Sequence, residues 1–171
     1  EDKFLEVEET MKYNNLSKAR SFGADFTFNY QIIPSLAIGG GYSYTDAKAQ
    51  YTDKPDDPDY MKYLPINATS LHNANWKVAW THKEIGVSLF GRYQSTRYYI
   101  TDGNGKANQI WRLNVRSTLL KTKKWNLGAN AGIDNIFNYI DRTPFGKNRG
   151  TTSPGRTIYL SLNVKFQNKQ K

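Results

Sequence analysis

Apolar and polar side chains alternate one by one over seven separate stretches of the chain. In the first stretch, from Arg20 to Gln31, every second residue is apolar and the residues between are polar or glycine. Successive side chains of a β-strand point to opposite faces of its sheet, so a period of two predicts a strand with one apolar and one polar face. The apolar positions here are Phe22, Ala24, Phe26, Phe28 and Tyr30.

Six further stretches repeat this pattern, and a weaker one, from Phe4 to Tyr13, precedes them all. Their apolar positions are Leu36, Ile38, Tyr42 and Tyr44; Ala74, Trp76, Val78 and Trp80; Ile85, Val87, Leu89 and Tyr93; Trp111, Leu113, Val115 and Leu119; Trp125, Leu127, Ala129, Ala131 and Ile133; and Ile158, Leu160, Leu162, Val164 and Phe166. The sequence therefore predicts an all-β, antiparallel protein of seven or eight strands.

Stretch length and charge favour strands that cross a membrane. The stretches are about twice as long as the five or six residues usual in soluble proteins, and a tilted strand needs about 9 to 11 residues to cross the hydrocarbon of a bilayer. Charges on the polar side, which a watery lumen tolerates and a packed core does not, are Asp25, Lys77, Arg92, Arg112, Arg116 and Asp134. We expect a transmembrane β-barrel with its apolar phase toward lipid, and keep a soluble β-sandwich as the weaker alternative.

Connections between the stretches alternate in length. Residues 32–35, 81–84 and 121–124 are short enough for tight turns, whereas the connections between are long. Outer-membrane barrels have short periplasmic turns and long extracellular loops. The pattern predicts extracellular loops at about 48–67, 101–108 and 139–155, within a barrel segment of residues 1–166 that ends in a polar periplasmic tail, residues 167–171.

Aromatic residues stand where a membrane barrel carries them, at the two boundaries between hydrocarbon and water. Near the short turns these girdle positions are Tyr30, Trp80, Trp125 and Phe166, and near the long loops they are Tyr42, Tyr44, Tyr93 and Trp111. Outer-membrane lipid and lipopolysaccharide are therefore expected partners.

Composition excludes several other classes of protein. Hydrophobic residues make up 38% of the 171 positions, a low share for a soluble globule, and no apolar run reaches the roughly 18 residues of a membrane-spanning helix. The absence of cysteine excludes disulfides and thiolate metal sites. A formal net charge of +9 is compatible with nucleic acid, but the basic residues are spread over turns, loops and strands, so no nucleic-acid partner is expected.

Several motifs point to one family. Residues 129–139 read ANAGIDNIFNY, the last strand opens with Ser153-Pro154-Gly155-Arg156, and it closes on Val164-Lys165-Phe166. Upstream come Tyr13-Asn14 with Lys18-Ala19-Arg20 and Gly23, followed by Tyr42-Ser43-Tyr44-Thr45-Asp46-Ala47. In order and spacing these motifs resemble the C-terminal part of TonB-dependent outer-membrane receptors.

That resemblance implies the last seven or eight strands of a barrel of about 22 strands, occluded by an N-terminal plug. The implied partners are the N-terminal barrel strands and plug of the same receptor, and TonB, which acts through that plug. The implied cargo is a small-molecule chelate. The implied function is energy-coupled uptake of a scarce nutrient, such as an iron–siderophore, haem or cobalamin, in the bacterial outer membrane and without a cofactor. One departure is the tail after Phe166, where family members usually stop.

The alternative is a self-contained eight-stranded outer-membrane barrel acting as an adhesin or structural anchor. A closed barrel would have to pair its first run with its last, yet the first run is acidic and alternates poorly at Glu6, Glu8 and Glu9. The polar phase also contains many Gly, Asn and Ser residues in place of the bulky charges that fill a narrow barrel. The receptor segment is therefore preferred.

Cargo contact is expected from aromatic and basic residues on the long loops, because they stack on and neutralise an anionic chelate or macrocycle. The candidates are Tyr60, Tyr63, Tyr98, Tyr99, Arg142, Phe145, Lys147 and Arg149. His72 belongs to the apolar phase and His82 to a turn, so neither is expected to bind a metal or haem. The Asp-rich residues 53–59 are expected to form a solvated loop in preference to a calcium site, and no acid–base or nucleophile arrangement indicates an enzyme.

Overall fold

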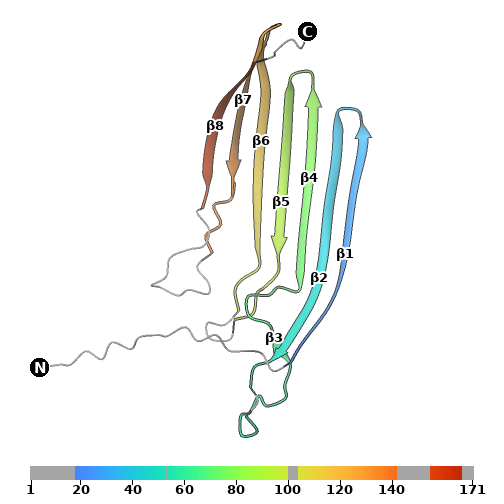
Figure 1. Ribbon diagram of the computed structural model, residues 1–171, viewed down its shortest axis with the longest axis vertical. Helices are drawn as coiled ribbons and strands as arrows, with labels where there is room; N and C mark the ends of the chain where they lie inside the picture. Colours follow the sequence, from blue (N-terminus) through green and yellow to red (C-terminus); the bar gives the residue numbers. More distant parts are fainter. Residues whose placement is uncertain (1–17, 53, 100–103, 142–154, 167–171) are drawn as a thin grey trace, which may run out of the picture.

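The computed structural model describes residues 18–52, 54–99, 104–141 and 155–166, which form one antiparallel sheet (Figure 1). Its strands are β1 (Lys18–Ile33), β2 (Leu36–Gln50), β3 (Leu64–Pro65), β4 (His72–His82), β5 (Ile85–Gln94), β6 (Asn108–Lys121), β7 (Trp125–Asp134) and β8 (Thr157–Phe166). Their order across the sheet is β1-β2-β4-β5-β6-β7-β8, with β3 paired to β2. The prediction of an all-β antiparallel fold is confirmed. The early run at 4–13 and the tail at 167–171 lie outside the described residues.

The sheet is a single layer with an apolar and a polar face. Among the described residues, Ala49 and Tyr99 are the only buried hydrophobic ones, so no second layer packs on either face. Large apolar side chains stay exposed instead: the exposed fractions of Phe22, Leu160 and Phe166 are 72%, 74% and 77%. So continuous an apolar surface is abnormal in water and normal for a wall that faces lipid. The described residues contain no helix long and apolar enough to span a bilayer.

Rows of cross-strand partners run obliquely across the sheet. We call its two ends the turn end, with the tight turns at 34–35, 83–84 and 122–124, and the loop end, with the long connections. One row consists of Leu36, Trp80, Val87, Val115, Ala131 and Leu160. It begins beside a tight turn at the start of β2 and finishes in the loop-end half of β8. The strands are therefore staggered and tilted, as closure of a sheet into a barrel requires.

A glycine on the apolar face lets two tryptophans meet across a strand. Gly91 of β5 stands in one row between Trp76 of β4 and Trp111 of β6. The indole of Trp76 lies across the glycine, so that a Cβ at this position would be 2.2 Å from its Nε1. The two indole rings thereby approach to 5.1 Å between centroids, in edge-to-face geometry.

A bulge in β6 changes one expected position. The register shifts between Thr118 and Leu120, so that Leu120 lies opposite Leu127. Leu119, which the sequence places in the apolar phase, has no cross-strand partner in this register. An inserted residue shifts the alternation of faces by one position. Because Leu119 and Leu120 are adjacent and both apolar, the sequence pattern looks the same with and without this shift.

The connection expected at residues 48–67 is partly strand. β2 continues to Gln50, and β3 pairs with it through Leu64 opposite Ala49 and Pro65 opposite Lys48. The alternation of large apolar residues has already ended there, so the period gives no signal for this extension. The other long connections lie between β5 and β6 and between β7 and β8.

Replacing Gly91 with alanine is expected to lower the free energy of unfolding by about 1–3 kcal/mol, the usual cost of overpacking, because the new Cβ displaces Trp76. The midpoint of urea unfolding in lipid vesicles, followed by tryptophan fluorescence, measures the change. Gly86→Ala is the matched control. Its Cβ would meet the Arg116 side chain at 2.6 Å, but that side chain is exposed and can move aside. Equal shifts in both variants would contradict the role given to Gly91.

Candidate functional site

An ion pair joins two connections at the loop end. Arg97 follows β5 and Asp141 follows β7, and the Arg97 guanidinium donates a hydrogen bond to the Asp141 carboxylate. Their side chains are only 11% and 9% exposed. Removing one partner of such a pair leaves a buried charge without compensation, so the pair ties these two connections together.

Arg97 also joins a third connection. Its backbone makes two hydrogen bonds, of 2.9 and 2.8 Å, to Gly105 of its own connection. It also forms a β-bridge with Ser70, which belongs to the third connection, between β2 and β4. The neighbouring Tyr98 is bonded to the same connection through the backbone of Ala68 and Thr69. The loop end is therefore one interconnected layer around Arg97.

Tyr139 belongs to the same cluster. Burial raises the pKa of Tyr139 above its ordinary value of 10.0, and the carboxylate of Asp141 raises it further, whereas the guanidinium of Arg97 acts in the opposite direction. The neutral phenol is therefore the form that the folded loop end favours.

The structure places the described cargo candidates in different surroundings. Tyr60 has an exposed fraction of 39%, and Tyr98 is half-buried. Tyr99 is only 6% exposed and lies beneath the Arg97 guanidinium, 5.6 Å from the ring centroid. Tyr63 is half-buried and lies against the guanidinium of Arg20, whose Cζ is 4.4 Å from the ring centroid. The candidates Arg142, Phe145, Lys147 and Arg149 lie outside the described residues.

The junction between β7 and β8 is held by two asparagines that sequence reasoning treated only as parts of a motif. The amide of Asn135 bonds both backbone groups of Tyr139, at 2.7 and 2.8 Å. The side-chain oxygen of Asn138 accepts a hydrogen bond from the backbone N–H of Arg156, whose Nε donates to the carbonyl of Ile136. Both asparagines have positive φ, a conformation that asparagine tolerates better than most residues. These two asparagines of the 129–139 motif therefore fix the backbone that leads from β7 toward β8.

The charges expected on the polar face are all present there. Arg112 forms an ion pair with Asp134 at 2.5 Å, and Ser43 donates a hydrogen bond to Asp25. Further along the face, the amide of Asn114 donates to Tyr159 at 2.9 Å. This surface suits contact with water or a polar partner and would be costly to bury in an apolar core.

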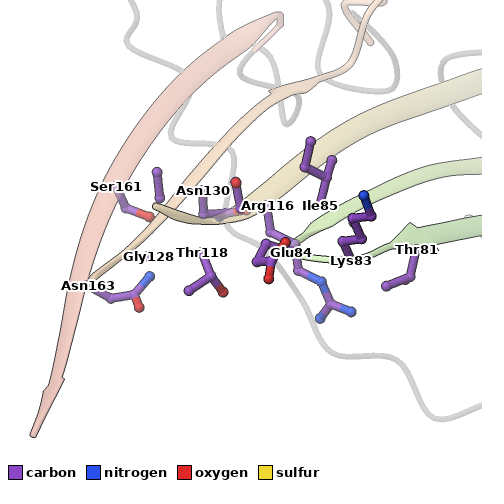
Figure 2. A pocket seen from close by; sticks show the side chains of 13 residues that line it. Thr81, Lys83, Glu84, Ile85, Arg116, Thr118, Gly128, Asn130, Ser161 and Asn163 are labelled. Atoms are coloured by element: carbon purple, nitrogen blue, oxygen red, sulfur yellow. The ribbon is translucent and has the colours of Figure 1, made fainter. Parts of the chain in front are cut away.

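Several shallow hollows mark the polar face, and two of them lie at opposite ends of the sheet. The larger, of about 600 Å³, lies toward the turn end, where Figure 2 shows Arg116, Asn130, Ser161 and Asn163 along its wall. The smaller, of about 300 Å³, lies toward the loop end. It combines two guanidinium groups with apolar side chains, and its lining includes Phe90, Arg92, Ile110, Arg112 and Asp134.

The expected girdle residues belong to the apolar phase of their strands. At the turn end Trp125 lies directly opposite Phe166. At the loop end Tyr44 lies opposite His72, and the Tyr42 hydroxyl is 2.7 Å from Nδ1 of that histidine. His72 is thus placed among aromatic rings on the apolar face. The described residues contain no group of three or more His, Cys, Asp or Glu side chains placed to hold a metal ion.

Removing either Arg97 or Asp141 is expected to destabilise the loop end. Arg97→Gln and Asp141→Asn should each cost about 3–5 kcal/mol of local stability, because each leaves a buried charge without its ion-pair partner. Amide hydrogen exchange of residues 95–99 measures the loss. The double variant should lose much less than the sum of the two single losses, and strict additivity would show that the two side chains do not interact.

Alkaline pH is expected to loosen the same region. The pKa of Tyr139 in the fold lies above the 10.0 of an unfolded chain, so its contribution is fully present below pH 10 and is lost as the pH rises through the raised pKa. The protection factors of residues 135–141, which divide out the base-catalysed rise in exchange that all amides share, should therefore fall at high pH. Tyr139→Phe should remove that dependence while Tyr60→Phe retains it, and an unchanged profile in Tyr139→Phe would assign the effect to another group.

Comparison with known proteins identifies the family. The family model for "TonB dependent receptor-like, beta-barrel" matches residues 2–136, and no curated protein sequence matches. Among solved structures, the ferric citrate transporter FecA in its unliganded form is similar, with 18% identity and a TM-score of 0.67 over 85% of this chain and 24% of that one. The copper transporter OprC has 18% identity and a TM-score of 0.60 over 86% of this chain and 24% of that one.

The chain therefore spans about a quarter of the length of each of these two transporters. That share, together with β1 and β8 standing as unpaired edges of the described sheet, favours a segment of a large barrel over a self-contained eight-stranded one. Proteins of this family are transporters and receptors of the outer membrane of Gram-negative bacteria and not enzymes. The chain belongs to the TonB-dependent receptor β-barrel family.

Proposed function

We propose that the chain forms the C-terminal wall of an outer-membrane receptor that imports a metal chelate with energy supplied through TonB. The division of one sheet into an apolar and a charged, hydrogen-bonding face carries this proposal. The apolar face meets lipid, and the polar face meets the plug and the watery lumen. In this orientation the loop end is extracellular, the turn end is periplasmic, and residues 167–171 lie in the periplasm.

A ferric chelate, such as an iron–siderophore, is the cargo we propose, with haem and cobalamin as the other cargo types. Two similar structures are named as transporters of ferric citrate and of copper, which favours a metal-containing cargo. The smaller hollow has matching chemistry, because Arg92 and Arg112 are cationic and Phe90 and Ile110 are apolar. Guanidinium groups bind carboxylate-bearing chelates through charge-assisted hydrogen bonds.

The loop candidates take different parts in this proposal. Exposed Tyr60 and half-buried Tyr98 contact the cargo first, together with Arg142, Phe145, Lys147 and Arg149 of the connection between β7 and β8. Tyr99 is buried under Arg97 and acts by holding the loop layer in place. The wall supplies a fixed passage, and the plug supplies the moving part.

Energy-coupled uptake of a labelled ferric chelate by whole cells tests the proposal. Deleting the receptor should abolish uptake of one such chelate, restoring the gene should recover it, and removing TonB should abolish it again. Arg92→Gln should raise KM about tenfold, the equivalent of ~1.4 kcal/mol for one charge-assisted contact. Lys123→Gln, at the turn end, is the matched control. Uptake that persists without TonB, or a deletion strain that imports every ferric chelate normally, would refute the proposal.

A further inference from the structure

The hairpin of β1 and β2 is longer than a bilayer crossing needs. β1 has 16 residues and β2 has 15, whereas β5, β7 and β8 have 10 each. About 9 to 11 residues suffice for a tilted strand. Figure 1 shows the surplus at the loop end, where the hairpin continues past the ends of β4 and β5 toward β3. On the proposed orientation, this surplus rises out of the outer leaflet.

The outward face of this hairpin changes from aromatic to charged toward the loop end, and its basic residues begin at the same level in both strands. On β1 the apolar phase runs through Phe26 and Phe22 and then continues as Arg20 and Lys18. On β2 the same face runs through Tyr42 and Tyr44 and then continues as Asp46 and Lys48; the register pairs Phe22 with Asp46 and Arg20 with Lys48. Lys18, Arg20 and Lys48, which we call the basic cluster, therefore lie together on the lipid-facing side.

An aromatic layer lies directly beneath the basic cluster. The ring of Phe22 meets that of Tyr44 at 6.4 Å between centroids, and Tyr44 meets His72 at 5.5 Å. The Tyr42 hydroxyl is 2.7 Å from the same histidine. Aromatic side chains of this kind settle at the level of the lipid headgroups. The basic cluster is thus positioned beside the outer part of those headgroups.

The charge of the cluster is only partly neutralised. Lys48 pairs with Asp46 at 2.9 Å, the only ion pair that involves the cluster within the described part of the chain. Arg20 is held by the ring of Tyr63, 4.4 Å from its Cζ. A guanidinium stacked on a ring still presents its N–H groups at its edge. Three cations and one carboxylate leave a net charge of about +2 facing the membrane surface.

We propose that the basic cluster binds the phosphate groups of an outer-leaflet lipid of the lipopolysaccharide class. Arginine and lysine bind phosphate through short charge-assisted hydrogen bonds, and the aromatic layer below contacts the acyl chains of the same lipid. This inference rests on the proposed function for the orientation of the wall and for nothing else. Tyr63 then orients Arg20 toward lipid and takes no part in cargo binding.

Titration of the complete detergent-purified receptor with lipid A carrying two phosphates, followed by native mass spectrometry, tests the inference. The double variant Arg20→Gln with Lys48→Gln should weaken binding on the order of tenfold. Lipid A without phosphates should bind equally weakly to both forms. Lys54→Gln with Lys62→Gln removes the same charge from the adjoining connection and should leave binding unchanged. Arg20→Lys with Lys48→Arg retains the charges and should retain binding, which separates loss of charge from loss of fold.

Unchanged binding in the first double variant would overturn the inference. Equal weakening in both charge-removing variants would also overturn it, because net charge and not a site would then attract the lipid. Loss of binding in a folded charge-retaining variant would show that positive charge at these positions does not bind the lipid and would overturn the inference as well. Cellular uptake of ferric chelate is measured on the same variants. A receptor that binds lipid A as expected but imports nothing would refute the transport function and leave the lipid site standing.

Discussion

Every backbone N–H and C=O inside a bilayer needs a partner from the protein itself, because lipid offers none. Hydrogen bonding between neighbouring strands meets this need here, and the remaining properties of the wall follow from it. Strand pairing sends alternate side chains to opposite faces, so one face carries Phe, Leu, Val and Trp residues and the other carries Asn, Ser, Arg and Asp residues. No packed core is needed, and Ala49 and Tyr99 are the only buried hydrophobic residues in the described part of the chain.

At the loop end the backbone leaves the lipid and individual polar contacts take over. Arg97 and Asp141 join two connections, and the bridge between Arg97 and Ser70 adds the third. Asn135 and Asn138 fix the passage from β7 toward β8. The wall is therefore specified by a repeated pattern, whereas the loop layer depends on single residues. Cargo selection by the loop layer fits this division, because loops on a rigid scaffold can change without changing the scaffold.

Local patterns made most of the wall predictable from sequence, because a period of two is visible within a single strand. The strands, the two faces and the charged positions of the polar face follow from that period, and the tight turns follow from the short connections between the stretches. Contacts between distant residues leave no such signal, so the pair Arg97–Asp141 and the burial of Tyr99 were not foreseen. The bulge beside Leu119 was missed since two adjacent leucines fit both phases, and the β2 extension was missed since its outward residues are charged.

The oblique rows of the sheet have a consequence for how such a barrel evolves. Cross-strand neighbours such as Leu36 and Trp80 begin a row that starts near the periplasmic boundary of the proposed orientation and ends with Leu160 in the extracellular half of β8. Compensating substitutions act between neighbours, whereas the cost of a polar side chain depends on depth in the lipid. Covariation between sequence positions will therefore follow diagonal lines around the barrel, while amino-acid preference changes along the membrane normal.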